Sequence, residues 1–225
     1  MKKILAILTL SFMIVSFVAP FLGGNEEKIK TDVAAQEEST GQTDEEKEEI
    51  QEVIKEEKSE LEIAQEEYDT KLENLNQTNL PKEEWFKQYK LLIEEHGDIL
   101  GKPETIYDIF TQQELDLLFR VVQAEIGSEY SFEQKCNVVS VIYNRLKDER
   151  FGNTINEILV SHQFSTISNG AIYRVTVDER TILACEYVYL FGDTTNGALF
   201  FDSNGRLRYT FVFNDGAHNF YTKRK

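Results

Sequence analysis

The sequence predicts an α+β domain over the C-terminal half of the chain, with helices first and a small antiparallel sheet after them. Four helix-start signals, each followed by apolar residues at helical spacing, lie between residues 111 and 179. After Gly197 the apolar pattern becomes that of extended strands, and two turn signals separate these strands. Helices that precede strands in the chain are typical of α+β folds.

An uncharged segment begins the chain. Lys2 and Lys3 precede residues 4–22, which contain no charged residue. This layout is typical of an export signal, and the run is also long enough to span a bilayer. We expect residues 1–24 to be either a cleaved signal peptide or a retained signal-anchor, and the latter would be a membrane tether. Both alternatives place the rest of the chain outside the cytoplasm.

Acidic residues are concentrated in a spacer at residues 25–80. The spacer holds 19 acidic and six basic residues and accounts for −13 of the net charge of −16. So negative a chain lacks the cationic surface that nucleic-acid binding needs, which excludes that class of protein. We expect residues 25–45 to be disordered, because they contain few large apolar side chains.

The later part of the spacer carries a seven-residue apolar repeat. Its members are Ile54, Leu61, Tyr68 and Leu75. The repeat predicts either a solvated single helix or a weak coiled coil through which two copies would weakly self-associate. A linking helix and connector follow at residues 81–110, and we expect Trp85 to pack on the domain at residues 111–225.

Capping boxes mark the four helix starts of this domain, since a Ser or Thr is followed three residues later by Glu or Gln. The four starts are Thr111, Ser131, Thr154 and Thr176. Glycine is common just after a helix, so we expect Gly127 and Gly192 to end the first and fourth helices.

Three short strands are expected after the helices. They lie at residues 198–201, 209–213 and 218–221. Asn204-Gly205 predicts a two-residue hairpin between the first two strands, and Asp215-Gly216 predicts a second turn.

The two cysteines, Cys136 and Cys185, lie in apolar helical segments. So few cysteines exclude a disulfide-dense scaffold. We expect two buried thiols, with a single bridge as the alternative.

Glu125 lies on the apolar face of the first helix, three residues after Val122 and seven after Leu118. It also lies at the C-terminal end of that helix. Burial and the partial negative charge of the helix end both disfavour the carboxylate, so we expect a raised pKa. A carboxyl that is protonated near neutral pH can act as a general acid. The alternative is a structural ion pair with Arg120 or Arg145.

The histidines do not form a metal motif. His96, His162 and His218 lack paired spacing such as HExxH, and there is no CxxC. A zinc site from His162 and His218 is the remaining alternative, and we expect neither a metal nor a cofactor. A serine triad is not indicated, because there is no GxSxG sequence.

Seven segments resemble, in order and spacing, the bacterial spore-cortex-lytic and cell-wall hydrolase family of the SleB/CwlJ type. They are residues 118–125, 138–146, 151–155, 163–165, 169–172, 197–201 and 216–221. The resemblance implies a lysozyme-like domain, similar to resuscitation-promoting factors and lytic transglycosylases. It implies cleavage of the β-1,4 bond between MurNAc and GlcNAc in the glycan strands of peptidoglycan. The family's catalytic glutamate follows Ala on the first helix, and that position is Glu125.

The resemblance leaves the mechanism open. A lytic transglycosylase needs one carboxyl, which protonates the leaving oxygen and later accepts a proton from the C6 hydroxyl. A hydrolytic muramidase would use a second carboxylate, for which Asp148, Asp202 and Asp215 are candidates. We favour the transglycosylase. The alternative functions are an N-acetylmuramoyl-L-alanine amidase and a non-catalytic wall-binding or germination-accessory module.

Further substrate-binding residues are expected around Glu125. The candidates for hydrogen bonds to sugars are Gln163, Ser165 and Asn169, those for stacking are Tyr173, Phe201 and Tyr221, and His218 is a candidate for substrate contact or loop support. For each, turn capping or core packing is the alternative. The acidic spacer stands where cortex-lytic members often carry a peptidoglycan-binding repeat, so spore cortex and vegetative wall both remain candidate substrates. We expect the protein in the cell wall or at the outer face of the cytoplasmic membrane.

Overall fold

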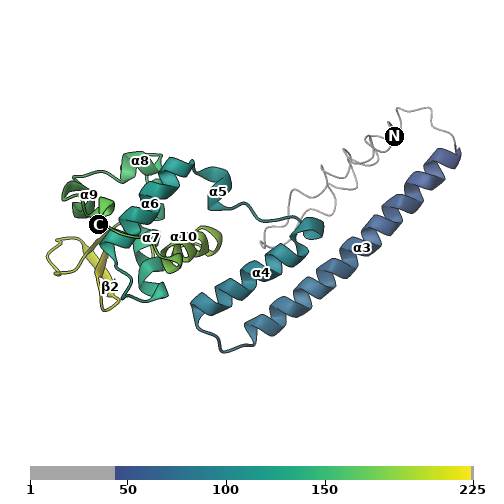
Figure 1. The fold of residues 1–225 in the computed structure, drawn as a ribbon, viewed down its shortest axis with the longest axis horizontal. Coiled ribbons are helices and arrows are strands. Elements are labelled where there is room, and N and C mark those ends of the chain that lie inside the picture. Colours follow the sequence, from purple (N-terminus) through teal and green to yellow (C-terminus); the bar gives the residue numbers. More distant parts are fainter. Residues whose placement is uncertain (1–43, 224–225) are drawn as a thin grey trace. The chain divides into compact units, whose positions relative to one another are not determined.

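The computed structural model describes residues 44–223, and their side chains from Ser59 onward (Figure 1). The predicted export segment at residues 1–24 and nearly all of the predicted disordered segment lie outside the described residues. In the part of the chain that the structure describes, no helix combines the length and apolarity needed to cross a membrane.

The described residues form two compact units. The first consists of residues 44–79 and Gln88–Pro103, and the second of Leu80–Lys87 and residues 104–223. The helices of the first unit are α3 (Asp44–Asn76) and the part of α4 (Lys82–Leu100) that begins at Gln88.

Within the first unit, α3 and α4 contact each other through polar and aromatic side chains. The ring of Tyr68 packs edge-on against His96, with the ring centroids 5.9 Å apart, and Lys71 forms an ion pair with Glu95. His96 is buried by these contacts. Tyr68 belongs to the predicted seven-residue repeat, so this position of the repeat faces α4. Self-association through α3 stays a prediction.

The remaining helices belong to the second unit. They are α5 (Ile106–Ile109), α6 (Gln112–Glu125), α7 (Phe132–Leu146), α8 (Ile155–Ile158), α9 (Ser165–Ser168), the 3-10 helix η1 (Ala171–Tyr173) and α10 (Glu179–Phe191). α7 lies at the centre of this unit and packs against α6, α8 and α10. Its consecutive residues Val138 and Val139, and Val141 and Ile142, are all fully buried. A helix that is apolar on several faces is expected to be buried in this way.

The first turn of α4 packs on α10. The ring of Phe86 is fully buried edge-to-face against Tyr187, and Trp85 packs against Phe191 at 5.6 Å between ring centroids. Trp85 is therefore a packing residue of the second unit, as the sequence predicts.

Three of the predicted helix starts are confirmed. The side chains of Thr111, Ser131 and Thr154 each accept a hydrogen bond from the amide three residues later, and the capping boxes are complete. These caps depend only on neighbouring residues, which explains why local sequence reveals them.

The predicted start of the fourth helix at Thr176 is wrong. α10 begins at Glu179, and Asp178 is its N-cap, with its carboxylate accepting from the amide of Thr181 at 2.7 Å. Asp178 also forms an ion pair with Lys135 of α7, at 3.5 Å. This contact from a distant part of the sequence favours Asp178 as the cap.

One of the two predicted helix ends is correct. Gly192, with a φ of 87°, follows the last residue of α10. Gly127 does not cap α6, because the helix ends at Glu125 and Ile126 is the C-cap, with an extended backbone. The side chain of Ile126 is fully buried and its carbonyl accepts from Lys135, so the chain leaves the helix before it reaches Gly127.

The sheet is antiparallel and contains β1 (Phe200–Asp202), β2 (Thr210–Asn214) and β3 (Asn219–Thr222) in the order β1-β3-β2. The turn at Asp215-Gly216 joins the paired strands β2 and β3, as predicted. The prediction of a hairpin at Asn204-Gly205 is wrong, because β1 and β2 are not neighbours in the sheet. Instead, the Asp202 carboxylate accepts from the amides of Gly205 and Arg206 and closes a longer loop. The α+β class is confirmed.

Cys136 of α7 and Cys185 of α10 are free and fully buried. Burial raises the pKa of both thiols, so neither is a thiolate near neutral pH. The prediction of two buried thiols is confirmed, and no bridge joins them.

Candidate active site

Glu125 is the last residue of α6 and is partly buried. It lies next to residues that are fully buried on the same helix face, Leu118 and Val122. The hydroxyl of Thr166, which is buried in α9, donates a hydrogen bond to Oε1 of Glu125 at 2.6 Å. One carboxyl oxygen is therefore fixed by a partner 41 residues further along the chain.

The pKa of Glu125 is raised. Burial is the main cause, and it outweighs the hydrogen bonds with Thr166 and the positive charge of Arg145, both of which lower the pKa. The direction agrees with the sequence prediction. A larger fraction of this carboxyl is protonated near neutral pH than of an exposed glutamate, and a protonated carboxyl can donate to a leaving group.

Arg145 of α7 is the cation that acts on Glu125. Its Nε donates to the carbonyl of Leu199 at 2.7 Å, and its Nη1 donates to Oε1 of Gln163 at 2.9 Å. The guanidinium carbon lies about 5 Å from the ring centroids of Phe151 and Phe164 and 5.5 Å from that of Phe200. The side chain is thus held by its own partners, and burial lowers its pKa to about 10, which leaves it charged at neutral pH.

Glu125 forms no ion pair within the described residues. Arg145 is directed at other acceptors, and Arg120 pairs with Asp116 at 2.8 Å. The alternative that Glu125 is one half of a structural ion pair with Arg120 or Arg145 is therefore not what the structure contains.

The predicted polar contacts to sugars fall into two groups. Ser165 is the first residue of α9 and Asn169 is its C-cap, and both are exposed. Oδ1 of Asn169 accepts from the amide of Ala171 at 2.8 Å. Gln163 is only partly exposed and binds Arg145. Thr166, the partner of Glu125, lies between Ser165 and Asn169 in sequence, so the α9 segment that carries these two candidates contacts the carboxyl through Thr166.

The predicted aromatic contacts also divide by exposure. Tyr173 in η1 is 79% exposed, so its ring is open to a ligand. Phe201 packs against the buried cluster of Val141, Ala198 and Phe220. It therefore sits at the junction of the sheet and α7.

His218 and Tyr221 are buried. Burial lowers the pKa of His218, and its Nδ1 has no hydrogen-bond partner in the described part of the chain. Tyr221 is 4% exposed, and its hydroxyl donates to Asp202 at 3.0 Å. Both rings therefore expose little surface to a sugar in this arrangement.

The three candidates for a second carboxylate all have other partners. Hydrogen bonds from Arg150 lower the pKa of Asp148 to about 2. Asp202 closes the loop after β1, and Asp215 accepts from Asn137 and from the amide of His218. The pKa of Glu125 is raised, whereas the pKa values of Asp148 and Asp202 are lowered.

Two contributors to this region were missed by sequence reasoning. Thr166 carries no local signal, because its partner is far away in sequence. Tyr209 stacks on Phe200 with the ring centroids 4.1 Å apart, and Tyr209 remains 41% exposed. Phe200 in turn packs on Arg145, so an exposed ring lies at the outer end of this stack.

No group of three or more His, Cys, Asp or Glu side chains able to hold a metal occurs within residues described by the structure. Of the two histidines considered for zinc, His162 is exposed and His218 is buried.

Comparison with known proteins gives a match to the C-terminal part of the chain. Residues 129–222 match a family model described as Cell Wall Hydrolase, which confirms the predicted resemblance over this range. The matched range begins four residues after Glu125 and does not include it. Support for a role of Glu125 therefore comes from the geometry of that residue. No curated protein gives a significant match.

Two solved structures are also similar to this chain. One is the catalytic domain of the germination-specific lytic transglycosylase SleB from Bacillus anthracis, at 20% identity and a TM-score of 0.45, covering 50% of this chain and 97% of that one. The other is the catalytic domain of the Bacillus cereus SleB protein, at 22% identity and a TM-score of 0.45, covering 50% and 92%.

Proposed function

We propose, starting from the cell wall hydrolase domain at residues 129–222, that this chain cleaves the β-1,4 bond between MurNAc and GlcNAc in peptidoglycan, with Glu125 as its acid and base. The observation that carries the proposal is the environment of Glu125. Its carboxyl is partly buried, has a raised pKa and is held at one oxygen by Thr166. Two roles for one carboxyl require that it can both give and take a proton.

Glu125 would act first as an acid. The protonated carboxyl donates its proton to the glycosidic oxygen, the bond to C1 of MurNAc breaks, and positive charge develops at C1. The hydrogen bond from Thr166 to Oε1 is compatible with this step, because it leaves Oε2 to carry the proton. The same hydrogen bond stabilises the carboxylate that remains.

Glu125 would then act as a base. The C6 hydroxyl of the same MurNAc residue attacks C1, and the carboxylate accepts the hydroxyl proton. The product is a 1,6-anhydro sugar, and the carboxyl returns to its protonated form. No water has to be activated, so this lytic transglycosylase route needs no second carboxylate.

The environment of the other carboxylates supports this route over hydrolysis. Asp148, Asp202 and Asp215 each accept hydrogen bonds from structural partners. A muramidase would need one of them to activate a water molecule across the cleft. Reducing ends among the products would favour that alternative.

The glycan strand would lie along the exposed residues near α9. Ser165 and Asn169 offer polar groups, and Tyr173 offers an open ring. We assign Phe201, His218 and Tyr221 to support of the sheet, because they are buried or packed in the core. Residues 1–24 would deliver the enzyme to the wall or hold it at the membrane, and the acidic spacer would separate it from that anchor.

Digestion of purified peptidoglycan tests the proposal. We expect the wild-type chain to release muropeptides with anhydro-MurNAc ends, which mass spectrometry identifies, and Glu125→Gln to release none. Glu129→Gln is the matched control, because Glu129 is exposed and lies only four residues away. Free stem peptides as the product would indicate an amidase instead. Binding to peptidoglycan without any turnover by the wild type would indicate the non-catalytic module.

A further inference from the structure

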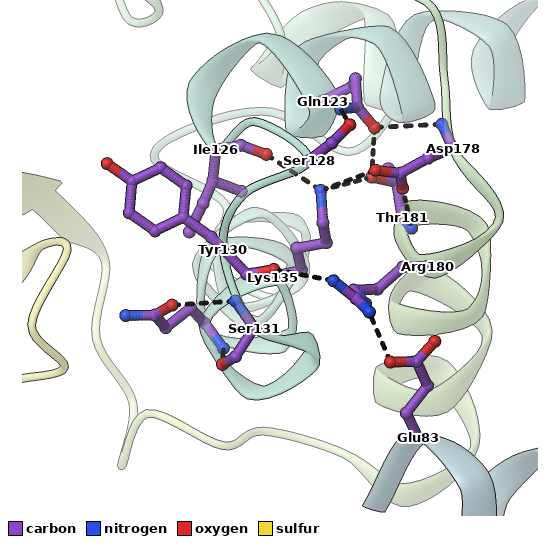
Figure 2. A network of polar contacts seen from close by, with 11 residues as sticks. Glu83, Gln123, Ile126, Ser128, Tyr130, Ser131, Lys135, Asp178, Arg180 and Thr181 are labelled. Carbon is purple, nitrogen blue, oxygen red and sulfur yellow. Dashed lines mark hydrogen bonds and ion pairs between the residues drawn. The ribbon is translucent and has the colours of Figure 1, made fainter.

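Lys135 of α7 is a fully buried lysine in the core of the second unit (Figure 2). Removing an ammonium group from water is costly unless partners replace its hydration. An ammonium has three N–H donors. A buried lysine therefore needs several hydrogen-bond acceptors. The positions of these acceptors show which segments of the chain the lysine connects.

The ammonium of Lys135 has three partners (Figure 2). It donates to the carbonyl of Ile126 at 3.0 Å and to Oγ1 of Thr181 at 2.9 Å, and it lies 3.5 Å from Oδ2 of Asp178. Ile126 is the residue directly after Glu125 and is the C-cap of α6. Carbonyls at a helix C-terminus lack intrahelical donors, and a cation is favourable there. Lys135 thus binds the chain one residue beyond Glu125.

Gln123 lies two residues before Glu125 and binds the start of α10. Its Oε1 accepts from Oγ1 of Thr181 at 2.6 Å and from the amide of Asp178 at 3.1 Å, and its Nε2 donates to Ser128. Both sides of Glu125 are therefore tied to the same pair of residues at the start of α10. We call this set the Lys135 cluster; its members are Gln123, Ile126, Ser128, Lys135, Asp178 and Thr181.

Asp178 and Lys135 are the two titratable members of the cluster, and each opposes the effect of burial on the pKa of the other. Burial alone would raise the pKa of Asp178, but hydrogen bonds from Ser128 and Thr181 and the charge of Lys135 lower it to about 2. Asp178 is therefore ionised wherever the enzyme would work. Burial lowers the pKa of Lys135, and Asp178 opposes that change.

We infer that the Lys135 cluster is a positioning device for Glu125, which fixes the end of α6 against the start of α10 so that the carboxyl meets the glycosidic oxygen. The inference rests on the proposed function of Glu125. Proton transfer depends on heavy-atom geometry to within a few tenths of an ångström, and a shift of about 1 Å can lower a rate about 100-fold. Lys135 touches no substrate in this role, since it is fully buried.

Thr181 provides the decisive variant, because it joins Lys135 to Gln123 and is itself fully buried. Lys135→Met would leave Asp178 unpaired and can fail to fold, whereas Thr181→Val keeps the shape of the side chain. Thr195→Val is the matched control. Thr195 is also fully buried, and the variant also loses two hydrogen bonds outside the cluster: one that Oγ1 donates to Asp193 and one that it accepts from Asn144.

The experiment compares the full-length variants by kcat on peptidoglycan, by affinity for soluble glycan strands and by amide hydrogen exchange at Glu125 and Ile126. For Thr181→Val we expect a kcat about 10- to 100-fold lower, unchanged affinity and faster exchange. Thr181→Ser should restore all three values, and Thr195→Val should stay within about twofold of wild type in kcat.

Equal kcat for Thr181→Val and Thr195→Val, with both folded, would overturn the inference. So would a loss of activity that Thr181→Ser does not restore. Full activity of Glu125→Gln would instead overturn the proposed function, whatever Thr181→Val does. The two failures are therefore separable.

Discussion

The hydrogen bond from Thr166 to Glu125 allows a quantitative prediction. Thr166→Val removes the hydroxyl that donates to Oε1 at 2.6 Å and keeps the size of the buried side chain. A hydrogen bond to a charged acceptor contributes about 1.5–3 kcal/mol, and about 1.4 kcal/mol changes an equilibrium tenfold. The hydroxyl also donates to the protonated form, where the bond is weaker by about 1–1.5 kcal/mol, so the ratio of protonated to ionised Glu125 should increase roughly 5- to 10-fold at any given pH.

The sign of this change is fixed by the structure. The hydrogen bonds with Thr166 lower the pKa of Glu125, so the loss of the hydroxyl should raise the pKa further. An NMR titration of the Glu125 carboxyl carbon should show a higher midpoint, and the alkaline limb of the activity profile should move upward by the same amount. The maximal rate should fall, because the carboxylate formed after proton donation loses a stabilising partner.

The neighbouring Ser165 provides the control. It is exposed and makes no hydrogen bond to Glu125, so Ser165→Ala should leave the titration midpoint in place. A Thr166→Val enzyme with an unchanged or lower midpoint would refute the reasoning, since the hydroxyl could then not be stabilising the carboxylate.

Three further predictions concern stability and binding. Because the pKa of Glu125 is raised, the native state loses stability as pH rises through that pKa. Thermal unfolding of Glu125→Gln should therefore occur at a higher temperature than that of wild type at pH 7, and the difference should vanish below the ordinary pKa of glutamate. A less stable variant at pH 7 would contradict this. Asp178 has a pKa lowered to about 2, so its contribution is present above the ordinary aspartate pKa and is lost as pH falls toward 2. Asp178→Asn should therefore cost about 1–3 kcal/mol at pH 7 in denaturant unfolding, and an equal cost at pH 2 would argue against the ion pair. Tyr173 is 79% exposed, so its ring can stack on a sugar. Tyr173→Ala should weaken the affinity for glycan strands, measured by calorimetry, roughly 3- to 10-fold without changing the melting temperature, and Tyr173→Phe should bind like wild type. Equal binding by all three proteins would exclude stacking at this ring.

Local features of the fold could be predicted from sequence, whereas contacts between distant segments could not. The capping boxes at Thr111, Ser131 and Thr154 involve residues three positions apart, and all three are present. The start of α10 was misplaced because Asp178 is held by Lys135, 43 positions earlier in the chain. Asn204-Gly205 does not form the predicted hairpin, because a turn dipeptide does not determine which strands are neighbours in the sheet.

In the candidate site, too, local features could be predicted from sequence, whereas contacts between distant segments could not. The position of Glu125 on an apolar helix face follows from helical periodicity, and its raised pKa follows from that position. Thr166 and the Lys135 cluster could not be predicted, because each joins segments that meet only in the folded chain. The burial of Tyr221 depends on the middle position of β3 in the sheet, which the sequence does not reveal.

The positive charge of Arg145 affects how strongly Glu125 holds its proton. A carboxyl that burial alone controlled would hold its proton too strongly and would be a poor donor. The guanidinium remains cationic at neutral pH, lies in a cage of three aromatic rings and attracts negative charge at Glu125. Its attraction favours the ionised form of the carboxyl and so opposes the rise that burial causes in the pKa of Glu125. In the proposed mechanism, this opposing effect would help one carboxyl both to release a proton and to recover it within a catalytic cycle.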